Sequence, residues 1–119
     1  MSKEYIIDLR LIRDGGLKAV ALITDAEGNE IDIITFESLY MHKSGICHST
    51  LDKAAKVVAE HGGKYISLKT NFIPLHKDFS QRRNNFPLTK ITRQRLQEYG
   101  VTIKDAELIN NDPETGLVL

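Results

Sequence analysis

A run of basic side chains in the last third of the sequence has the composition of a phosphate-binding surface. Residues 77–95, which we call the basic segment, contain six Lys or Arg side chains and one acid, Asp78. Lys and Arg neutralise phosphates, amides and hydroxyls hydrogen-bond to phosphate, sugar or base edges, and aromatic rings stack on unpaired bases. The side chains that we predict to contact nucleic acid or an acidic partner are Lys77, Phe79, Arg82, Arg83, Phe86, Lys90, Arg93 and Arg95.

An acidic stretch balances the basic segment within the same chain. Residues 22–37 contain five acids and no Lys or Arg. The formal net charge is +0, so the chain as a whole exerts no long-range attraction on nucleic acid or membranes. Three interpretations of the basic segment stay open: contact with nucleic acid, contact with an acidic protein, and a solvated surface paired with the acidic stretch.

Histidine and cysteine side chains lie close together in the sequence at His42, Cys47 and His48. Imidazole and thiolate are zinc ligands, but no C-x₂-C or H-x₃-H pair completes a set of four. A cysteine beside a histidine also suggests a thiol nucleophile, although neighbours in sequence need not be neighbours in space. Glycine-rich phosphate-binding motifs are missing from the sequence as well. We therefore predict neither a zinc site nor a nucleotide cofactor.

The composition is typical of one globular domain, which we expect to span residues 1–119. Of the 119 residues, 41% are hydrophobic and 27% are charged. The single cysteine, Cys47, excludes an internal disulfide and favours a reducing compartment. The first residues, MSKEYIIDLRL, lack the long apolar region of a secretion signal, and no apolar run reaches the roughly 18 residues of a membrane span. We expect a cytoplasmic protein.

Three strands are predicted in the first third of the chain, at residues 4–13, 17–24 and 30–36. The first alternates between an apolar face and a mixed face that includes Asp8 and Arg10. Turn residues separate the three strands, so they should form an antiparallel meander. The apolar face of the first strand consists of Tyr5, Ile7, Leu9 and Leu11.

The clearest helical pattern covers residues 48–63. Ser49 or Thr50 could cap its amino end, and Gly62 occupies the position of a left-handed carboxyl cap. Residues 64–72 follow as a fourth strand. Because the connection to it is a helical crossover, this strand should run parallel to one of the first three.

A second helix is predicted at residues 87–100 and a fifth strand at 101–109. Pro87 suits the first turn of this helix, and Gly100 should end it. The complete order is βββαβαβ, an α+β arrangement in which parallel strands extend the meander and helices pack on the sheet. An unpaired edge strand in such a sheet offers a route to a homodimer.

This order of elements resembles that of the ribonuclease H-like superfamily. The stretches that carry the resemblance are YIIDLRL, VALITDAEGNEI, AAKVVAEHGGKYISLKTN and NNDPETGLVL. Nucleases of the superfamily hold two divalent cations with carboxylates on the first strand, on the first helix and at the end of the fourth strand. Mg²⁺ prefers oxygen ligands, and two such ions stabilise the attacking and leaving oxygens of a phosphodiester.

The resemblance implies a candidate catalytic set of Asp8, Asp52 and Asn71. Asn71 stands where the superfamily has an acid, and its amide supplies no negative charge. Each acid also has an ordinary interpretation: Asp8 could pair with Arg10 or Lys18, and Asp52 would be favoured in a first helical turn by the helix dipole. Alternative carboxylates are Asp14, more simply a turn residue, Asp78 and Asp112.

Three functions compete on this basis. The first is a small nucleic-acid-binding accessory protein of ribonuclease H-like shape, without catalysis and without a cofactor. The second is a phage or mobile-element protein that binds a host protein and inhibits or adapts it. The third is a nuclease that depends on Mg²⁺ or Mn²⁺. The nuclease would use Asp8, Asp52 and a carboxylate not yet located, for which Asp78 and Asp112 are candidates. If the side chains of Asp8, Asp52 and Asn71 lie within roughly 5 Å of one another, the resemblance is supported, whereas positions on opposite faces count against it.

Overall fold

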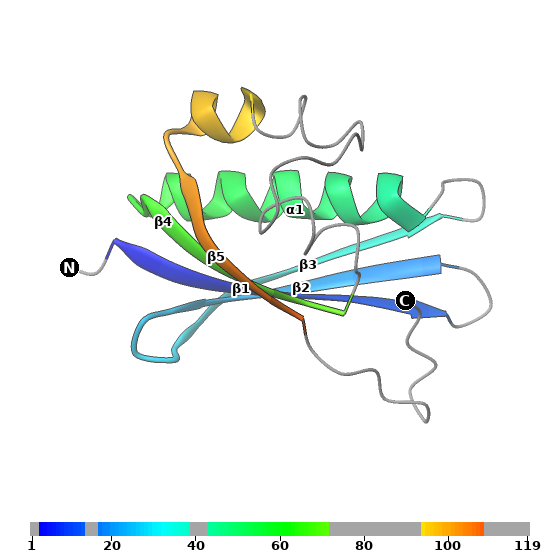
Figure 1. Cartoon of the computed structure of the whole chain (residues 1–119). Coiled ribbons are helices and arrows are strands. Elements are labelled where there is room, and N and C mark those ends of the chain that lie inside the picture. The colour runs from blue at the N-terminus through cyan, green and yellow to red at the C-terminus, as the bar shows by residue number, and fades with distance from the viewer. Residues whose placement is uncertain (1–2, 14–16, 39–42, 72–93, 109–119) are drawn as a thin grey trace.

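The computed structural model describes residues 3–13, 17–38, 43–71 and 94–108 of the chain (Figure 1). Three strands are followed by a helix, a strand, a short helix at residues 94–99 and a last strand. This is the predicted order. The labelled elements are β1 (Glu4–Arg13), β2 (Leu17–Asp25), β3 (Glu30–Ser38), α1 (Lys43–Glu60), β4 (Tyr65–Thr70) and β5 (Thr102–Leu108).

The five strands form one mixed sheet in the order β3-β2-β1-β4-β5. β1 pairs antiparallel with β2, and β2 pairs antiparallel with β3, so the predicted meander is confirmed. β4 lies parallel to β1 on its other side, and β5 lies parallel to β4. β3 and β5 are the edge strands, and a homodimer through one of them stays a prediction.

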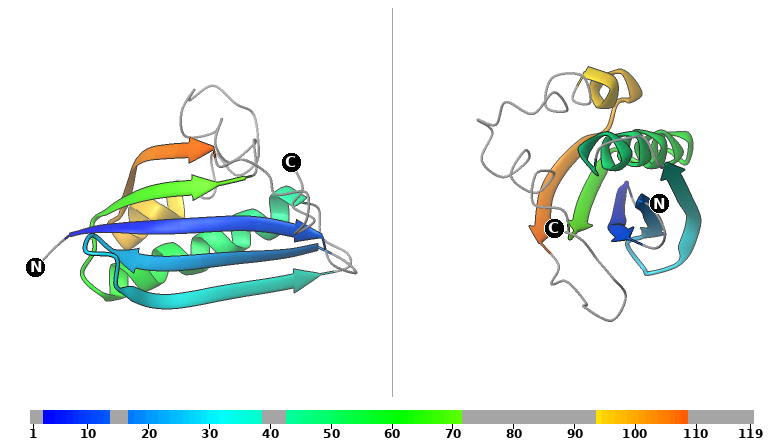
Figure 2. Two further views of the ribbon diagram at one scale, coloured as in Figure 1. Left: turned by 90° about the horizontal axis from the view of Figure 1, so that it is seen from below. Right: turned by 90° about the vertical axis from the view of Figure 1, so that its right-hand side faces the viewer.

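The hydrophobic core lies between the sheet and α1, which covers one face of the sheet (Figure 2). Ile7, Leu9 and Leu11 of β1 are fully buried on this side, as the alternating pattern predicted. The opposite side, which we call the open face, carries the mixed residues of β1, including Asp8 and Arg10. Within the described ranges, neither helix is both long and apolar enough to cross a membrane.

Helix α1 begins earlier than the sequence pattern indicated. It starts at Lys43, so Ser49 and Thr50 lie inside it and the prediction that one of them caps its amino end is wrong. The Thr50 hydroxyl donates a hydrogen bond to the Ile46 carbonyl at 2.8 Å, as a helical threonine does. Burial of Ile46 and Cys47 against the sheet favours the extra turns.

Two consecutive glycines end α1 and allow β1 to pack closely against it. Gly62 has φ +81°, and its N–H donates to the Ala59 carbonyl, which confirms the predicted left-handed cap. The Gly63 N–H donates to the Val58 carbonyl at 2.9 Å. A Cβ atom on Gly63 would lie 2.5 Å from Val58 Cγ1 and 2.6 Å from Tyr5 Cδ1, so only glycine fits there.

The helix at 94–99 ends in the same way. Gly100 has φ +80° and donates to the Gln97 carbonyl, and Val101 donates to the Leu96 carbonyl. Leu96 and Val101 are both buried, and they hold this helix on the core. The earlier part of the predicted helix, residues 87–93, lies outside the described residues.

We predict that Gly63→Ala destabilises the protein by about 1–3 kcal/mol, because the new methyl group overlaps Val58 and the Tyr5 ring. Urea unfolding followed by circular dichroism measures the free energy of unfolding. Gly62→Ala is the matched control, since its Cβ would meet nothing within 4 Å and only the positive φ is unfavourable. Wild-type stability in Gly63→Ala would contradict the close packing seen here.

Candidate functional site

Asn71 lies directly after β4 and uses its amide as an additional link between β4 and β1. The parallel register pairs Thr70 with Leu9, so Asn71 follows the last paired residue. Its Oδ1 accepts a hydrogen bond from the Leu11 N–H at 2.8 Å, and its Nδ2 donates to the Leu11 carbonyl at 3.0 Å. The side chain is fully buried. Asn71 therefore satisfies both backbone groups of Leu11 where the strand pairing stops.

A carboxylate could not make the same pair of hydrogen bonds. An ionised aspartate only accepts hydrogen bonds. One of its oxygens could bind the Leu11 N–H, but the other would face the Leu11 carbonyl oxygen. A buried charge without a compensating donor or cation is strongly unfavourable. The geometry at Asn71 thus selects an amide over an acid.

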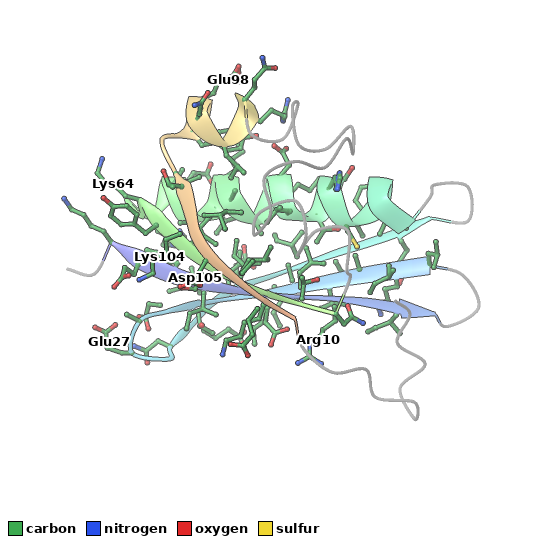
Figure 3. The ribbon with its side chains drawn as sticks, in the orientation of Figure 1. Arg10, Glu27, Lys64, Glu98, Lys104 and Asp105 are labelled. Atoms are coloured by element: carbon green, nitrogen blue, oxygen red, sulfur yellow. The ribbon has the colours of Figure 1, made fainter. Side chains whose placement is uncertain are left out.

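Asp8 lies on the open face of the sheet, away from α1. Its neighbours along β1, Ile7 and Leu9, are the residues buried beneath the helix. The Asp8 carboxylate accepts a hydrogen bond from Arg10 Nε at 2.8 Å, which is the ordinary pairing considered from the sequence. Figure 3 shows Arg10 on the side of the sheet opposite α1. Asp8 therefore does not face α1, as it would have to do to share a metal ion with Asp52 of that helix.

Asp52 is a middle residue of α1, and its carboxylate binds two side chains of the helix at 94–99. Arg95 donates from Nε to Oδ1 at 2.6 Å and from Nη2 to Oδ2 at 3.0 Å. The Tyr99 hydroxyl donates to Asp52 Oδ1 at 2.9 Å and accepts from Arg95 Nη2 at 3.1 Å. We call these three residues the Asp52 cluster. The expectation that the helix dipole explains Asp52 is wrong, because α1 starts nine residues earlier, at Lys43.

The pKa values within the Asp52 cluster follow from these contacts. Hydrogen bonds to Asp52 and the carboxylate's charge raise the pKa of the Arg95 guanidinium, which stays protonated. Removal from water raises the pKa of the Tyr99 hydroxyl, and its hydrogen bond to Asp52 raises it further. The cluster is therefore a neutralised ion pair with a protonated tyrosine, and its carboxylate oxygens are already engaged.

The three candidate catalytic residues thus have separate environments and separate partners. Asp8 is on the open face, Asp52 binds the second helix, and Asn71 binds the backbone of β1. Within the described parts of the chain, no group of three or more His, Cys, Asp or Glu side chains could hold a metal ion. The alternative carboxylates Asp14, Asp78 and Asp112, and also His42, lie outside the described residues.

Cys47 and His48 are on the first turns of α1 and are largely shielded from water. Burial raises the pKa of the Cys47 thiol to about 12, which opposes formation of the thiolate needed in a nucleophile. Burial lowers the pKa of His48 to about 3, so its ring is neutral at ordinary pH. No local pattern indicated this burial, because it depends on the early start of α1.

The basic segment is represented in the described residues by Gln94 and Arg95. The other predicted contacts lie outside them: Lys77, Phe79, Arg82, Arg83, Phe86, Lys90 and Arg93. Described residues lie on both sides of residues 72–93. Asn71 precedes them and binds Leu11, and Arg95 follows them and binds Asp52. The Arg95 guanidinium is thus engaged within the fold through Nε and Nη2, and its contact with nucleic acid or an acidic partner stays a prediction.

Comparison with known proteins identifies the architecture. Neither the known protein-family models nor the curated protein sequences give a match to this chain. Solved structures do match over nearly its whole length. The N-terminal RNase H domain of a Mycobacterium tuberculosis protein has a TM-score of 0.73 at 10% identity and covers 96% of this chain and 92% of its own. The chain has the ribonuclease H-like fold.

Two further structures agree with this assignment. RNase H1 from Halobacterium salinarum NRC-1 has a TM-score of 0.64 at 14% identity, covering 95% of this chain and 89% of that chain. LC11-RNase H1, solved in complex with an RNA/DNA hybrid, has a TM-score of 0.65 at 12% identity, covering 94% and 88%. Identities this low establish the fold alone. The resemblance first drawn from the order of elements is confirmed at that level.

We predict that Asn71→Asp makes stability depend on pH with a definite sign. In this variant a protonated carboxyl group can donate to the Leu11 carbonyl and accept from its N–H, whereas the carboxylate cannot. Burial should raise the pKa of the new side chain in the folded state above that in the unfolded state, so the stabilisation is present at low pH and lost as pH rises. At pH 7 the variant should be less stable than wild type by more than about 2 kcal/mol.

Chemical denaturation at several pH values measures this difference. Asn71→Leu is the control: it leaves both Leu11 backbone groups unpaired, but its deficit relative to wild type should not vary with pH. If the loss of stability of Asn71→Asp relative to wild type stays constant or becomes smaller as pH rises, the assigned hydrogen bonds are contradicted.

We predict that His48 makes stability change with pH in the opposite direction, because burial lowers its pKa in the folded state. The unfolded state takes up a proton near pH 6.5 while the folded state does so only near pH 3. Stability is therefore full above pH 6.5 and is lost as pH falls through this window. His48→Leu should remove roughly 2 kcal/mol of that loss at pH 4.5. Paired denaturation curves, with an NMR titration of the His48 ring, test this.

Proposed function

We propose that this protein binds nucleic acid through its basic segment and does not cleave it. The binding half of the proposal rests on the six Lys or Arg side chains of the basic segment. The non-catalytic half depends on one observation, the environment of Asn71. Where the superfamily places an acid, this chain has a buried amide that is hydrogen-bonded at both its donor and its acceptor. A neutral, fully paired group supplies neither the charge nor the free oxygen that a catalytic Mg²⁺ requires.

The positions of the two acids support the same conclusion. Asp8 is paired with Arg10 on the open face, and Asp52 is paired with Arg95. To bind a metal ion together, they would have to leave these partners and approach from different elements. The nuclease alternative is therefore disfavoured by three independent contacts.

The open face of the sheet is a weaker candidate for binding nucleic acid than the basic segment. Its basic side chains alternate with acids. Arg10 pairs with Asp8, Lys18 lies 3.6 Å from Glu37, and Lys104 forms an ion pair with Glu4. A phosphate there would meet carboxylates as well as cations. Figure 3 shows Lys104 and Asp105 next to each other on β5.

The structural neighbours suggest which nucleic acid to test first. LC11-RNase H1 was solved in complex with an RNA/DNA hybrid, and its chain has the fold found here. An RNA/DNA hybrid is therefore the first ligand to examine, with double-stranded DNA and single-stranded RNA beside it. The phage or host-protein alternative has no comparable support in the comparisons.

We predict salt-dependent binding of a fluorescent RNA/DNA hybrid, measured by anisotropy between about 20 and 200 mM NaCl. Combined substitution of Arg82→Gln and Arg83→Gln should weaken binding and reduce the slope of log K against log [salt] by about 2, because each arginine neutralises one phosphate. Lys56→Gln, which removes an exposed base from α1, is the matched control and should leave the slope unchanged. No binding to any of the three nucleic acids at the lowest salt would overturn the proposal.

The non-catalytic half of the proposal has its own assay. The labelled hybrid is incubated with the protein and Mn²⁺ or Mg²⁺, and the products are separated on a denaturing gel. We expect intact substrate. Cleavage that disappears in Asp8→Asn would establish the nuclease alternative and overturn this half.

A further inference from the structure

The open face of the sheet carries a continuous set of apolar side chains on β1, β2 and β3. Leu22 is paired with Ile33 of β3, and Val20 is the next residue on the same face of β2. Ile6 and Ile12 of β1 are diagonal neighbours of these residues in the antiparallel register. We call these five residues the apolar stripe.

The apolar stripe is in contact with water. The Ile33 side chain is 49% exposed, and among the described residues it is one of two large hydrophobic side chains that are exposed, the other being Tyr65. The other four members of the stripe are half-buried. Figure 2 shows α1 on the opposite face of the sheet and β3 at its edge. A contiguous apolar surface of this kind is typical of an interaction site.

The dimensions of the apolar stripe match those of a helix. The stripe extends over three neighbouring strands, a width of about 10 Å at about 4.8 Å between strands. An α-helix with its side chains is about 10 Å wide. Ile12 follows Ile6 by six residues along β1, which corresponds to about 20 Å of strand or about 13 residues of helix. A helix of three to four turns, lying along the strands, would therefore cover the stripe.

Addition of a strand at the edge of β3 is a less suitable way to cover the same region. The Ile33 N–H already donates a hydrogen bond to the Asp32 carboxylate at 2.8 Å. Glu30, Asp32 and Glu37 are all exposed on this edge strand, and charged side chains on an edge oppose pairing with another strand. The face of the hairpin is therefore the better docking surface.

The charges of β3 indicate the chemistry of the partner. Residues 22–37, all of them described, contain five acids and no Lys or Arg. Glu30 is paired with Thr24, and Glu37 with Lys18, so both glutamates lie on the open face, near the two ends of β3. Lys18 is 3.6 Å from Glu37 and offsets one of these charges. A partner with Lys or Arg beside its apolar side chains would be attracted here, whereas an acidic one would be repelled.

We infer that the apolar stripe is the docking site for an amphipathic helix of a partner protein. The apolar side of that helix packs on Ile33 and its neighbours, and Lys or Arg side chains at its borders lie next to Glu30 and Glu37. The inference goes beyond the proposed function and is independent of it, because the basic segment takes no part. It assigns a second interaction surface, of opposite charge, to the same chain.

The experiment uses two synthetic peptides of about 14 residues. The basic peptide carries leucines at helical spacing with Lys and Arg at the borders of the apolar side, and in the acidic peptide every Lys and Arg is replaced by Glu. The full-length protein labelled with ¹⁵N is titrated with each peptide and followed by NMR. We expect the basic peptide to shift the amide signals of residues 20–24 and 31–35, and the acidic peptide to leave them unchanged.

The variants test the apolar and the charged contributions separately. Ile33→Thr combined with Leu22→Thr keeps β-branched residues in both strands and should weaken binding of the basic peptide at least tenfold. Tyr65→Thr, which removes the other exposed large hydrophobic side chain, is the matched control and should bind as wild type does. Glu30→Gln combined with Glu37→Gln should weaken binding about twofold to fivefold, and Glu98→Gln on the second helix should not.

Four results would overturn the inference. The first is that neither peptide binds, or that both bind equally well. The second is that the shifted signals lie in α1. The third is a wild-type dimer in sedimentation velocity that the Ile33→Thr and Leu22→Thr pair converts to a monomer, since the occupant would then be a second copy of this chain. The fourth is a set of NOEs in the free protein between the Ile33 methyl groups and residues 117–119, since the chain itself would then cover the stripe.

Discussion

Burial of one face of β1, together with hydrogen bonding along both of its edges, is the constraint on which the other elements depend. β1 lies between β2 and β4, and Ile7, Leu9 and Leu11 have no exposed surface. A parallel partner requires a crossover connection, and here α1 is that crossover. The same helix therefore covers the apolar face of β1 and delivers β4 to its edge. Gly63 permits the close approach of Tyr5 to Val58 that this arrangement requires.

At the end of β4, the buried apolar surroundings are incompatible with a site made of charged carboxylates. A two-metal centre needs several carboxylates around cations in a wet, polar pocket. Here Leu9 and Leu11 of the neighbouring β1 are buried, and Asn71 completes the hydrogen bonding of the backbone without adding charge. Introducing one carboxylate would give a buried unpaired charge and no metal site. Metal binding at this place would require several changes together, since a single buried acid is unfavourable.

The alternation of side chains along a strand is a local property, and so the faces of β1 and the order of elements could be predicted from the sequence. Gly62 and Gly100 were predictable for a similar reason, because a left-handed cap favours glycine at one position. The start of α1 could not be predicted in this way, because the burial of Ile46 and Cys47 favours the first turns and no recognisable cap residue marks them. That error placed Asp52 in a first turn. Asp52 contacts Arg95, which is 43 residues away, and Asn71 contacts Leu11, which is 60 residues away. Contacts over such separations produce no local sequence pattern from which they could be predicted.

The distribution of charge limits how this protein can bind a polyanion. The described residues contain 11 Lys or Arg and 12 Asp or Glu, so this part of the chain is close to neutral. Residues 77–93 contain five Lys or Arg and one acid. If phosphate contacts come from this stretch alone, at most five counterion-releasing contacts form, and the salt slope on duplex DNA is no steeper than about −4.5. A steeper slope would require Lys or Arg side chains from outside this stretch to take part, so the ligand would extend beyond the basic segment.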